Sequence, residues 1–446
     1  MTRVSSSHYD VAAKSDLLSC PHAWIGLGGT TTMDSTSDIY VWAWLPGETT
    51  PVPAGRLREN AGGNFSFDYG RLYRQRENAV SLSPTLPLTG DTYGPTGSLG
   101  LPGALRDASP DAWGRRVVQY QVTGDRGSDA DTGDVDERTY LLRSGSNRFG
   151  AIDFQSSPEE YVPRDSAPAP LTELLSAADI VEAGGDLSYE LERALLSGTA
   201  MGGARPKAIL HDGAREYIAK FTASNDNFPV VGAEAASMFL AERAGIDVAS
   251  TRVETVLGRS VLLVERFDRG DRGERVLAVS ALTMTGLDEL QARSGSYVDF
   301  LDSLRMNRAP EGTAAELFTR IAFNMAISNS DDHLRNHAAL WDGTKAVLSP
   351  AYDLSPMRRS GETASQAISY DRKGARTNNF AELLSVRNLY GLSEADASGI
   401  LERIQGVIHD NWEDAAEHGR LTSADKRLLW GRQFLNPGTL YGFNGH

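Results

Sequence analysis

Cysteine is almost absent from this chain of 446 residues, which contains only Cys20. A single cysteine excludes an intrachain disulfide framework and a zinc site built on cysteine pairs. The chain also lacks an apolar run of about eighteen residues, so we expect no transmembrane helix. Its N-terminus has no apolar core of the kind that a signal peptide carries. These absences favour a globular protein of a reducing compartment, and we expect a cytoplasmic location.

A positive charge excess is missing as well. The chain has 44 basic and 59 acidic residues, for a formal net charge of −15. This balance argues against a protein that grips nucleic acid through its general surface, although it leaves a local basic patch or a basic partner open. Two hydrolase signatures are also absent. There is no Gly-x-Ser-x-Gly elbow, and Leu334 follows His333 where a zinc protease would need glutamate.

The front of the chain has mostly strand character. Residues 1–37 are rich in small polar residues without a sustained period, and we predict a flexible tail there. Residues 38–150 are predicted to form a β-rich subdomain. Its expected elements are strands at Ile39–Leu45, Val52–Leu57 and Phe65–Tyr69, an extended edge segment at Leu82–Leu88, and one helix over Gly103–Val118.

The rest of the chain changes from hairpins to helices. Residues 156–170 are Pro- and Ser-rich and predict a linker. A small lobe is expected over 171–268, and a helical large lobe over 269–446, with helical patterns dominating from Ser280. In the small lobe we expect a helix over Leu171–Leu196, a hairpin over Ala208–Phe221 with a turn at Asp212-Gly213, a helix over Glu234–Ala244 and a hairpin over Thr251–Arg266.

The stretch Ile327–His337 concentrates the polar chemistry, and an apolar helical pattern leads into it. Asp331 is followed five residues later by Asn336, and Asp353 lies between apolar neighbours further on. An acid, an Asn and a further acid form the set that Mg-ATP phosphoryl transfer uses. The first acid orients the accepting hydroxyl, and the other two residues ligate magnesium. A helix cap is the plain alternative for Asp331, but three independent caps in this order are the poorer account.

Two features earlier in the chain could bind phosphate groups. Lys220 lies in an apolar strand, on the face opposite Ala219 and Phe221, and Glu234 is its candidate ion-pair partner. A strand-end lysine in solvent is the alternative. A loop of closely spaced glycines lets backbone amides approach phosphate, although an ordinary glycine turn is an equal alternative. The loop residues are Met201, Gly202, Gly203, Ala204, Arg205, Pro206 and Lys207.

Zinc is the rival metal. His333 and His337 are four residues apart, a spacing that binds zinc when both lie on a helix, and Asp331 and Asp332 are close by. No third His or Cys ligand is evident, so we favour magnesium. For His337 we prefer a packed, hydrogen-bonding residue.

Together these segments resemble the HipA family of toxin serine/threonine kinases, over nearly the whole chain from about Ile39. Several separate motifs in the same order carry the resemblance. They are Ala54–Leu57, Phe65–Tyr69, Leu82–Pro84, Gly103–Gly114, Gly202–Lys207, Val264–Asp268, Asn329–Asn336 and Tyr352–Pro356.

The resemblance implies an α+β, two-lobed protein-kinase-like fold with an extra β-rich N-terminal subdomain and a mainly helical C-terminal lobe. It also implies a role for each matching residue. Asp331 corresponds to the catalytic aspartate, Asn336 and Asp353 to the magnesium ligands, Lys220 to the ATP-phosphate lysine, Met201–Lys207 to the phosphate loop, Glu265 and Phe267 to the adenine-contacting hinge, and His333 to a histidine of the ATP site.

The implied function is that of an ATP- and Mg²⁺-dependent protein serine/threonine kinase, the toxin of a toxin–antitoxin pair. Known members act with a small, dimeric helix-turn-helix antitoxin (HipB-like) that binds operator DNA, so we expect DNA contact only through it. In the founding case the target is an aminoacyl-tRNA synthetase, which makes a translation component the candidate substrate. The alternatives are a non-catalytic co-repressor bound to the antitoxin on operator DNA and a small-molecule kinase.

Two positions depart from the family pattern. Members often carry a phosphate-loop serine whose autophosphorylation silences the kinase, and Ala200 stands at that position here. Self-inactivation by this route is therefore not expected, unless Ser197 or Thr199 takes over. Arg335 stands where some members have lysine, and we expect tolerance because arginine also neutralises phosphate charge.

Overall fold

The computed structural model describes residues 38–123, 133, 135–164, 169–183, 185, 188, 191, 195, 205–222 and 228–443. The predicted tail, residues 1–37, lies outside this set. None of the helices in the described part of the chain has both the length and the apolar character that a membrane crossing requires.

The front subdomain is built on an antiparallel sheet in the order β4-β3-β2-β1-β5. The three predicted strands are present, and a fifth strand beyond residue 150 pairs with β1. The strands are β1 (Ile39–Ala43), β2 (Val52–Glu59), β3 (Phe65–Tyr69), β4 (Thr92–Tyr93) and β5 (Ile152–Gln155), and the helices are α1 (Arg71–Arg74), α2 (Gly103–Asp107), α3 (Ala112–Thr123) and α4 (Glu137–Arg143).

Two expectations for this region are wrong. The single helix over Gly103–Val118 is two helices, α2 and α3, because Pro110 cannot continue an α-helix through Ser109. The segment around Leu82–Leu88 makes only an isolated bridge between Ser83 and Leu86, and the edge of the sheet is β4 instead. Prolines at positions 84 and 87 remove the backbone donors that a longer strand would need.

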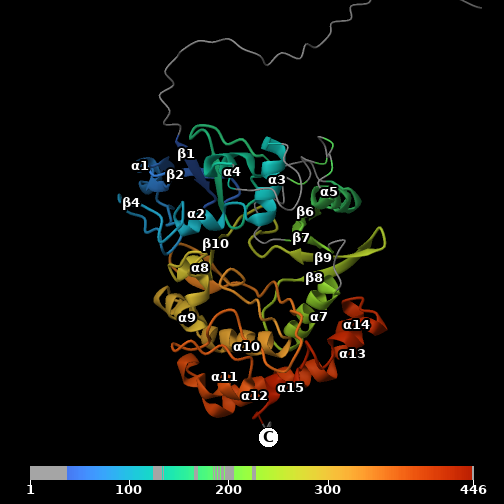
Figure 1. The fold of residues 1–446 in the computed structure, drawn as a ribbon. Helices are drawn as coiled ribbons and strands as arrows, with labels where there is room; N and C mark the ends of the chain where they lie inside the picture. The colour runs from blue at the N-terminus through green and yellow to red at the C-terminus, as the bar shows by residue number, and fades with distance from the viewer. Residues whose placement is uncertain are drawn as a thin grey trace, which may run out of the picture. The chain divides into compact units, whose positions relative to one another are not determined.

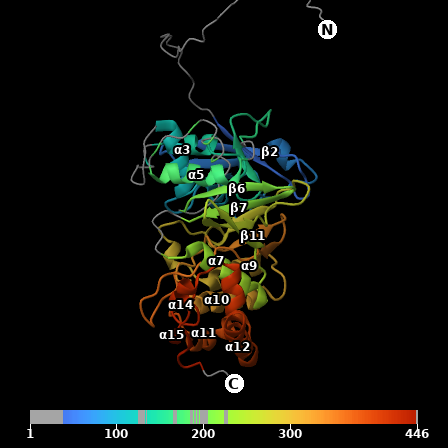
Figure 2. The ribbon, with the colours of Figure 1, turned by 90° about the vertical axis from the view of Figure 1, so that its right-hand side faces the viewer.

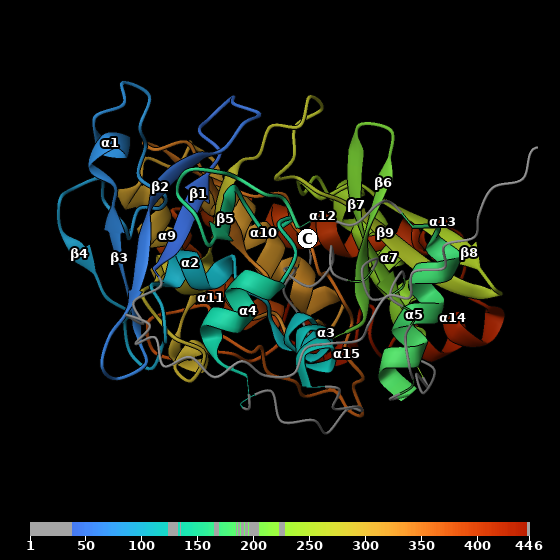
Figure 3. The same ribbon diagram turned by 90° about the horizontal axis from the view of Figure 1, so that it is seen from above.

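The small lobe contains a four-stranded antiparallel sheet in the order β6-β7-β9-β8. Both predicted hairpins are present, with turns at Gly213 and Gly258, where positive φ angles favour glycine. Its elements are α5 (Leu171–Ala183), β6 (Lys207–Asp212), β7 (Arg215–Phe221), α7 (Val230–Arg243), β8 (Thr251–Val256) and β9 (Arg259–Glu265). Seen from above, the front sheet and this sheet lie side by side, with α2, α3 and α4 between them (Figure 3).

The large lobe is mainly helical, but it contains a sheet that the sequence did not suggest. Strands β10, β11 and β12 form a short antiparallel sheet in the region where we expected helical patterns to dominate. The elements are β10 (Leu277–Ser280), α8 (Ala281–Met284), η2 (Ala292–Ser294), α9 (Tyr297–Met306), α10 (Thr313–Ala326), β11 (Ala338–Trp341), β12 (Ala346–Leu348), α11 (Phe380–Ser385), η3 (Arg387–Tyr390), α12 (Glu394–Asp410), α13 (Trp412–His418), α14 (Ser423–Leu429) and α15 (Pro437–Leu440).

Helix α10 is the centre of this lobe. From Leu317 to Ala326 all its residues are buried, and Figures 1 and 2 show it among the surrounding helices, below the small-lobe strands. The polar stretch 327–337 leaves its C-terminus and leads into β11, and Asp353 follows β12. The two polar segments predicted to act together therefore flank one short hairpin.

The segment 156–164 is not a free linker. The Tyr161 ring packs against Trp42 and Trp44 at centroid distances of 5.4 and 5.5 Å. Arg164 forms an ion pair with the buried Asp153 at 2.8 Å. These contacts fix the segment on the front sheet.

Candidate active site

Lys220 forms the ion pair that the sequence predicted and a second one that it did not. Its Nζ lies 2.6 Å from Glu234 Oε1 on α7 and 2.7 Å from Asp353 Oδ1, in the segment after β12. The side chain is only 18% exposed, so the alternative of a strand-end lysine in solvent is wrong. Alternation along β7 buries Tyr217, Ala219 and Phe221 on the other face. One ammonium group thus joins the sheet, α7 and the large lobe.

The charged groups in this cluster shift one another's pKa values. Burial opposes the charge on Lys220, but the Asp353 and Glu234 carboxylates outweigh burial and raise the pKa of Lys220. The Lys220 charge in turn lowers the pKa of Asp353. Lys207 starts β6 directly opposite Lys220, and burial together with the Lys220 charge lowers the pKa of Lys207 to about 8. Two lysines therefore lie side by side at the start of β6 and on β7.

Asp353 adopts an unusual backbone conformation, with φ +59°. The left-handed region is strained for a residue with a side chain, and such strain concentrates at functional positions. Its carbonyl lies 3.4 Å from the Asn329 carboxamide nitrogen, and Met357 N donates to Ser328 O at 3.1 Å. These bonds hold the Asp353 segment against the 327–337 stretch.

Asp331 and Asp332 have opposite surroundings. Asp332 is buried, and its Oδ2 accepts hydrogen bonds from the Tyr297 hydroxyl and from Asn324 Nδ2, the latter at 2.8 Å, and contacts His337 Nε2 at 3.0 Å. Asp331 is exposed, and its carboxylate has no hydrogen-bond or ion-pair partner among the described residues. Asp331 caps none of the described helices. The free carboxylate is thus held in place by its buried neighbour.

The zinc alternative required His333 and His337 to lie on one helix, and they do not. His333 and His337 lie in a turn and an extended segment, not on a helix. No group of three His, Cys, Asp or Glu side chains in the described part of the chain is arranged to hold a metal. His337 is a buried partner of Asp332, as the plain interpretation predicted. His333 contributes to the lowered pKa of Asp353, and its Nδ1 is buried without a hydrogen-bond partner.

The residues fit magnesium bound together with a nucleotide. Magnesium usually takes one or two protein oxygens plus phosphates and waters, so no larger cluster is needed. Asn336 offers a carboxamide that has no hydrogen-bond partner among the described residues. Asp353 offers Oδ2, because the hydrogen bond from Lys220 uses only Oδ1. Both are hard oxygen donors of the kind that this ion prefers.

Arg335 links the same stretch to the front subdomain. It pairs with Asp107 of α2 at 3.5 Å and with Glu289 at 2.5 Å. Asp107 is buried and also accepts hydrogen bonds from the N–H and hydroxyl of Ser280, at 2.8 and 2.7 Å. The Tyr352 hydroxyl donates to Arg335 O at 2.8 Å. Arg335 is therefore committed to protein partners, whereas we expected it to neutralise phosphate.

The predicted hinge follows β9. Glu265 N donates to Ser250 O at 2.8 Å, and the Phe267 ring packs against Tyr352 at 5.4 Å. Between them Arg266 is buried and bonds to Asp268 at 2.7 Å and to the Arg148 carbonyl at 2.6 Å. The hinge is thus attached to the front subdomain, a contact that the sequence did not signal.

The predicted phosphate loop is described only from Arg205 onward. Met201, Gly202, Gly203 and Ala204 lie outside the described residues, as do Ser197, Thr199 and Ala200. Arg205 is exposed, and Pro206 and Lys207 are buried where β6 begins. Lys207 O accepts the Trp113 indole N–H at 3.1 Å, so the end of the loop is anchored on α3.

Sequence reasoning missed several residues around the site. Asn324 and Tyr297 brace the 327–337 stretch through Asp332, and Asp107 supports Arg335 from another subdomain. A polar residue such as Asn324 inside a buried helix was the one available signal. The others become neighbours only through the tertiary fold.

Comparison with known proteins gives two family matches. Residues 48–155 match the model of the HipA N-terminal domain, and residues 199–412 match the HipA-like C-terminal domain. Among curated proteins, Y4mE, a candidate kinase of Sinorhizobium fredii, is 25% identical over 338 residues, which is 67% of this chain and 74% of that protein.

One solved structure shows the same fold over most of this chain. A chain of the complex of HipA, HipB and operator DNA, from the toxin–antitoxin system of Shewanella oneidensis MR-1, superposes with a TM-score of 0.60 at 19% identity. The match covers 88% of this chain and 94% of that chain. The predicted two-lobed fold class is therefore confirmed. The Helicobacter pylori proinflammatory kinase CtkA gives a TM-score of 0.41 at 14% identity, over 54% of this chain and 92% of that one.

Proposed function

The chain belongs to the HipA family, and from this premise we propose that it is an ATP- and Mg²⁺-dependent protein serine/threonine kinase. One observation carries the proposal. Lys220 bridges Glu234 and Asp353, at 2.6 and 2.7 Å, beside a stretch in which Asp331 is free of partners. Phosphoryl transfer needs this combination, because it depends on positioning and on charge neutralisation more than on covalent chemistry.

Asp331 acts on the acceptor hydroxyl. Its carboxylate orients the hydroxyl and accepts the proton while the oxygen forms a bond to the γ-phosphorus of ATP. The bond between that phosphorus and the bridging oxygen breaks, and ADP leaves with the electron pair. The free, exposed state of the Asp331 side chain supports this role, because a carboxylate already engaged in the fold could not accept the substrate's proton.

Asn336 and Asp353 hold magnesium in this proposal. When bound, the ion neutralises charge on the phosphate oxygens. Lys220, Lys207 and Arg205 supply further positive charge, with the loop Met201–Ala204 contributing backbone amides. Glu265 and Phe267 form the adenine-contacting hinge, and His333 lines the nucleotide site.

The proposal extends to a toxin with an antitoxin partner. The family and its complex with HipB and operator DNA support a HipB-like helix-turn-helix dimer as partner. The net charge of −15 is consistent with DNA contact through that partner. A translation component such as an aminoacyl-tRNA synthetase is the candidate substrate, and the cytoplasm is the compartment in which these components meet.

Phosphotransfer from labelled ATP tests the proposal. Purified wild type and Asp331→Asn are added with magnesium to a cell lysate, and labelled species are identified by mass spectrometry. We expect the label on a protein serine or threonine, falling by about 10²- to 10⁴-fold in the variant. Near-wild-type transfer by the variant would remove Asp331 from the mechanism. No label with ATP binding intact would favour the co-repressor, and label on a metabolite would favour a small-molecule kinase.

A further inference from the structure

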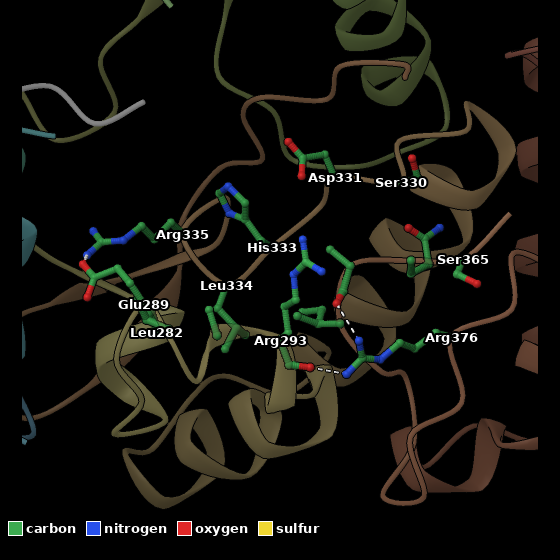
Figure 4. A pocket seen from close by; sticks show the side chains of 14 residues that line it. Leu282, Glu289, Arg293, Ser330, Asp331, His333, Leu334, Arg335, Ser365 and Arg376 are labelled. Atoms are coloured by element: carbon green, nitrogen blue, oxygen red, sulfur yellow. Dashed lines mark hydrogen bonds and ion pairs between the residues drawn. The ribbon is translucent and has the colours of Figure 1, made fainter. Parts of the chain in front are cut away.

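A pocket of about 480 Å³ opens beside Asp331 and is separate from the Lys220 cluster. Figure 4 shows Asp331, His333 and Arg293 around it, with the Arg376 guanidinium bonded to two backbone carbonyls. Because Asp331 lines this pocket, an acceptor that occupies it can reach the Asp331 carboxylate. Its lining includes Arg293, Ser330, Asp331, Ser365, Gln366 and Ala367.

One wall of the pocket is the free edge of a short β-ribbon. Gln366 N donates to Arg376 O at 2.7 Å, and Asn378 N donates to Ala364 O at 2.9 Å, around a bridge between Ser365 and Thr377. Backbone groups alternate in direction along a strand. Those of Ser365 therefore point away from the ribbon, as does the N–H of Ala367, whereas the Ala367 C=O accepts a hydrogen bond from Arg376 Nη1 at 3.1 Å. Within the described residues, the N–H and C=O of Ser365 and the N–H of Ala367 have no hydrogen-bond partner.

The buried and unpaired carboxamide of Gln366 is a second, independent feature of this pocket. Its side chain is 2% exposed, yet neither its Oε1 nor its Nε2 has a hydrogen-bond partner. Buried polar groups are nearly always bonded, because an unpaired one destabilises the fold. A carboxamide offers one acceptor and two donors, which is the complement of a peptide group. Gln366 lines the same pocket as the free edge.

From these features we propose that the acceptor is an extended polypeptide segment that pairs with the edge Ser365–Ala367 as an added strand, while the Gln366 carboxamide bonds to one of its peptide groups. The inference rests on the proposed kinase function and specifies its substrate. Free groups on alternate residues of one edge match the repeat of a strand. A small molecule could not span this edge, and a folded surface without a free strand could not pair with it.

Backbone methylation of a peptide substrate tests the strand pairing. The probe is a library of serine-centred dodecapeptides, from which the best wild-type substrate is taken and methylated at one backbone nitrogen at a time. We expect methylation to raise the KM about tenfold, the effect of losing one well-formed hydrogen bond, at alternate residues only. A uniform or absent effect along the peptide would refute the strand pairing.

A pair of glutamine variants tests the carboxamide. Gln433 is a matched control, since it is 3% exposed and its Oε1 also lacks a partner, but it does not line the pocket. Gln366→Ala is expected to raise the peptide KM about tenfold while the KM for ATP and the ATPase rate without peptide stay unchanged. Gln433→Ala should change none of these values. Equal effects of the two variants would contradict the proposal.

The remaining outcomes separate this inference from the proposed function. In one outcome, folded proteins are labelled in an Asp331-dependent way, but no peptide and no unfolded protein is labelled. This result would contradict an extended substrate and would leave the proposed kinase function standing. Labelling of small molecules alone would overturn both the polypeptide acceptor and the proposed protein kinase, in favour of a small-molecule kinase. If neither peptide, protein nor metabolite is labelled in an Asp331-dependent way, the proposed function itself fails.

Discussion

Asp331 and Asp332 are neighbours in the chain, but the fold treats them differently. Asp332 is buried and joins Tyr297, Asn324 and His337. Asp331 is exposed and has no partner among the described residues. The sequence alone presented both as candidate site residues, and only burial distinguishes the one that supports the structure from the one available to a substrate.

Replacing each acid by alanine should separate stability from activity. Asp332→Ala leaves buried donors without an acceptor, so we expect the free energy of unfolding to fall by about 3 kcal/mol. Asp331→Ala should change it by less than about 0.5 kcal/mol while abolishing phosphotransfer. Urea denaturation and a phosphotransfer assay check both. Equal destabilisation would show that Asp331 also supports the fold.

Lys207 should report nucleotide binding through its proton. With a pKa lowered to about 8 by burial and by Lys220, it is about half protonated at pH 8. Phosphate anions favour the charged form, so ATP binding should raise this pKa and take up protons near pH 8. Calorimetry in two buffers of different ionisation enthalpy measures the uptake. Lys207→Met should reduce it, and an unchanged uptake in that variant would exclude Lys207 as the source.

At the scale of elements, helix α2 contacts residues of the large lobe, outside its own subdomain. Its last residue, Asp107, bonds to Ser280, the last residue of β10, and pairs with Arg335. The position of Arg335, one residue before Asn336, therefore depends on a helix more than two hundred residues earlier in the chain. The front subdomain thus contacts the large lobe through polar groups at this point.

Removing Asp107 should affect both stability and turnover. Asp107→Ala leaves the Ser280 N–H and hydroxyl without their acceptor and removes one of the two carboxylate partners of Arg335. We expect a loss of about 2–4 kcal/mol in unfolding free energy, with a lower kcat. Glu289, the more exposed partner of Arg335, is the control, and Glu289→Ala should cost less than about 1 kcal/mol. Chemical denaturation and steady-state kinetics provide the comparison. A larger effect for Glu289 would reverse this assignment.

How far the sequence predicted the elements depended on the range of their interactions. The hairpins over 207–221 and 251–265 were predicted because Asp212-Gly213 and Gly258 signal turns locally, and α10 because its apolar period is sustained. The β10–β12 sheet was missed because strands of three or four residues carry too little pattern. In the same way, the Lys220–Glu234 pair follows from strand and helix order. Asp107, Asp332 and Gln366 gain their surroundings only from tertiary contacts.

At the scale of the whole described molecule, buried charges join the front subdomain to the lobes. Arg266 bonds to the Arg148 carbonyl and to Asn147, and Asp268 accepts the Gly150 N–H at 2.7 Å. Arg269 also bonds to Arg148 O, at 2.6 Å. Separating the parts would leave these groups unpaired, which costs more than the loss of an exposed contact. The front subdomain is therefore expected to share the stability of the lobes.

Hydrogen exchange should reveal this shared stability. In mild denaturant, we expect the amides of β1 and α10 to reach the same free energy of opening, within about 1 kcal/mol, because both exchange only by global unfolding. Mass spectrometry of peptides from the two elements checks this. Earlier exchange of β1 would instead show that the front subdomain unfolds on its own.

The ion pair between Lys220 and Asp353 has a thermodynamic consequence. A bare polyphosphate must compete with Asp353 for Lys220, and a bare divalent cation must compete with Lys220 for Asp353. The metal–nucleotide complex satisfies both partners at once, so each ligand should increase the affinity for the other by the same factor. The site would then discriminate against either half alone, and titrations of nucleotide with and without magnesium would give the size of that coupling.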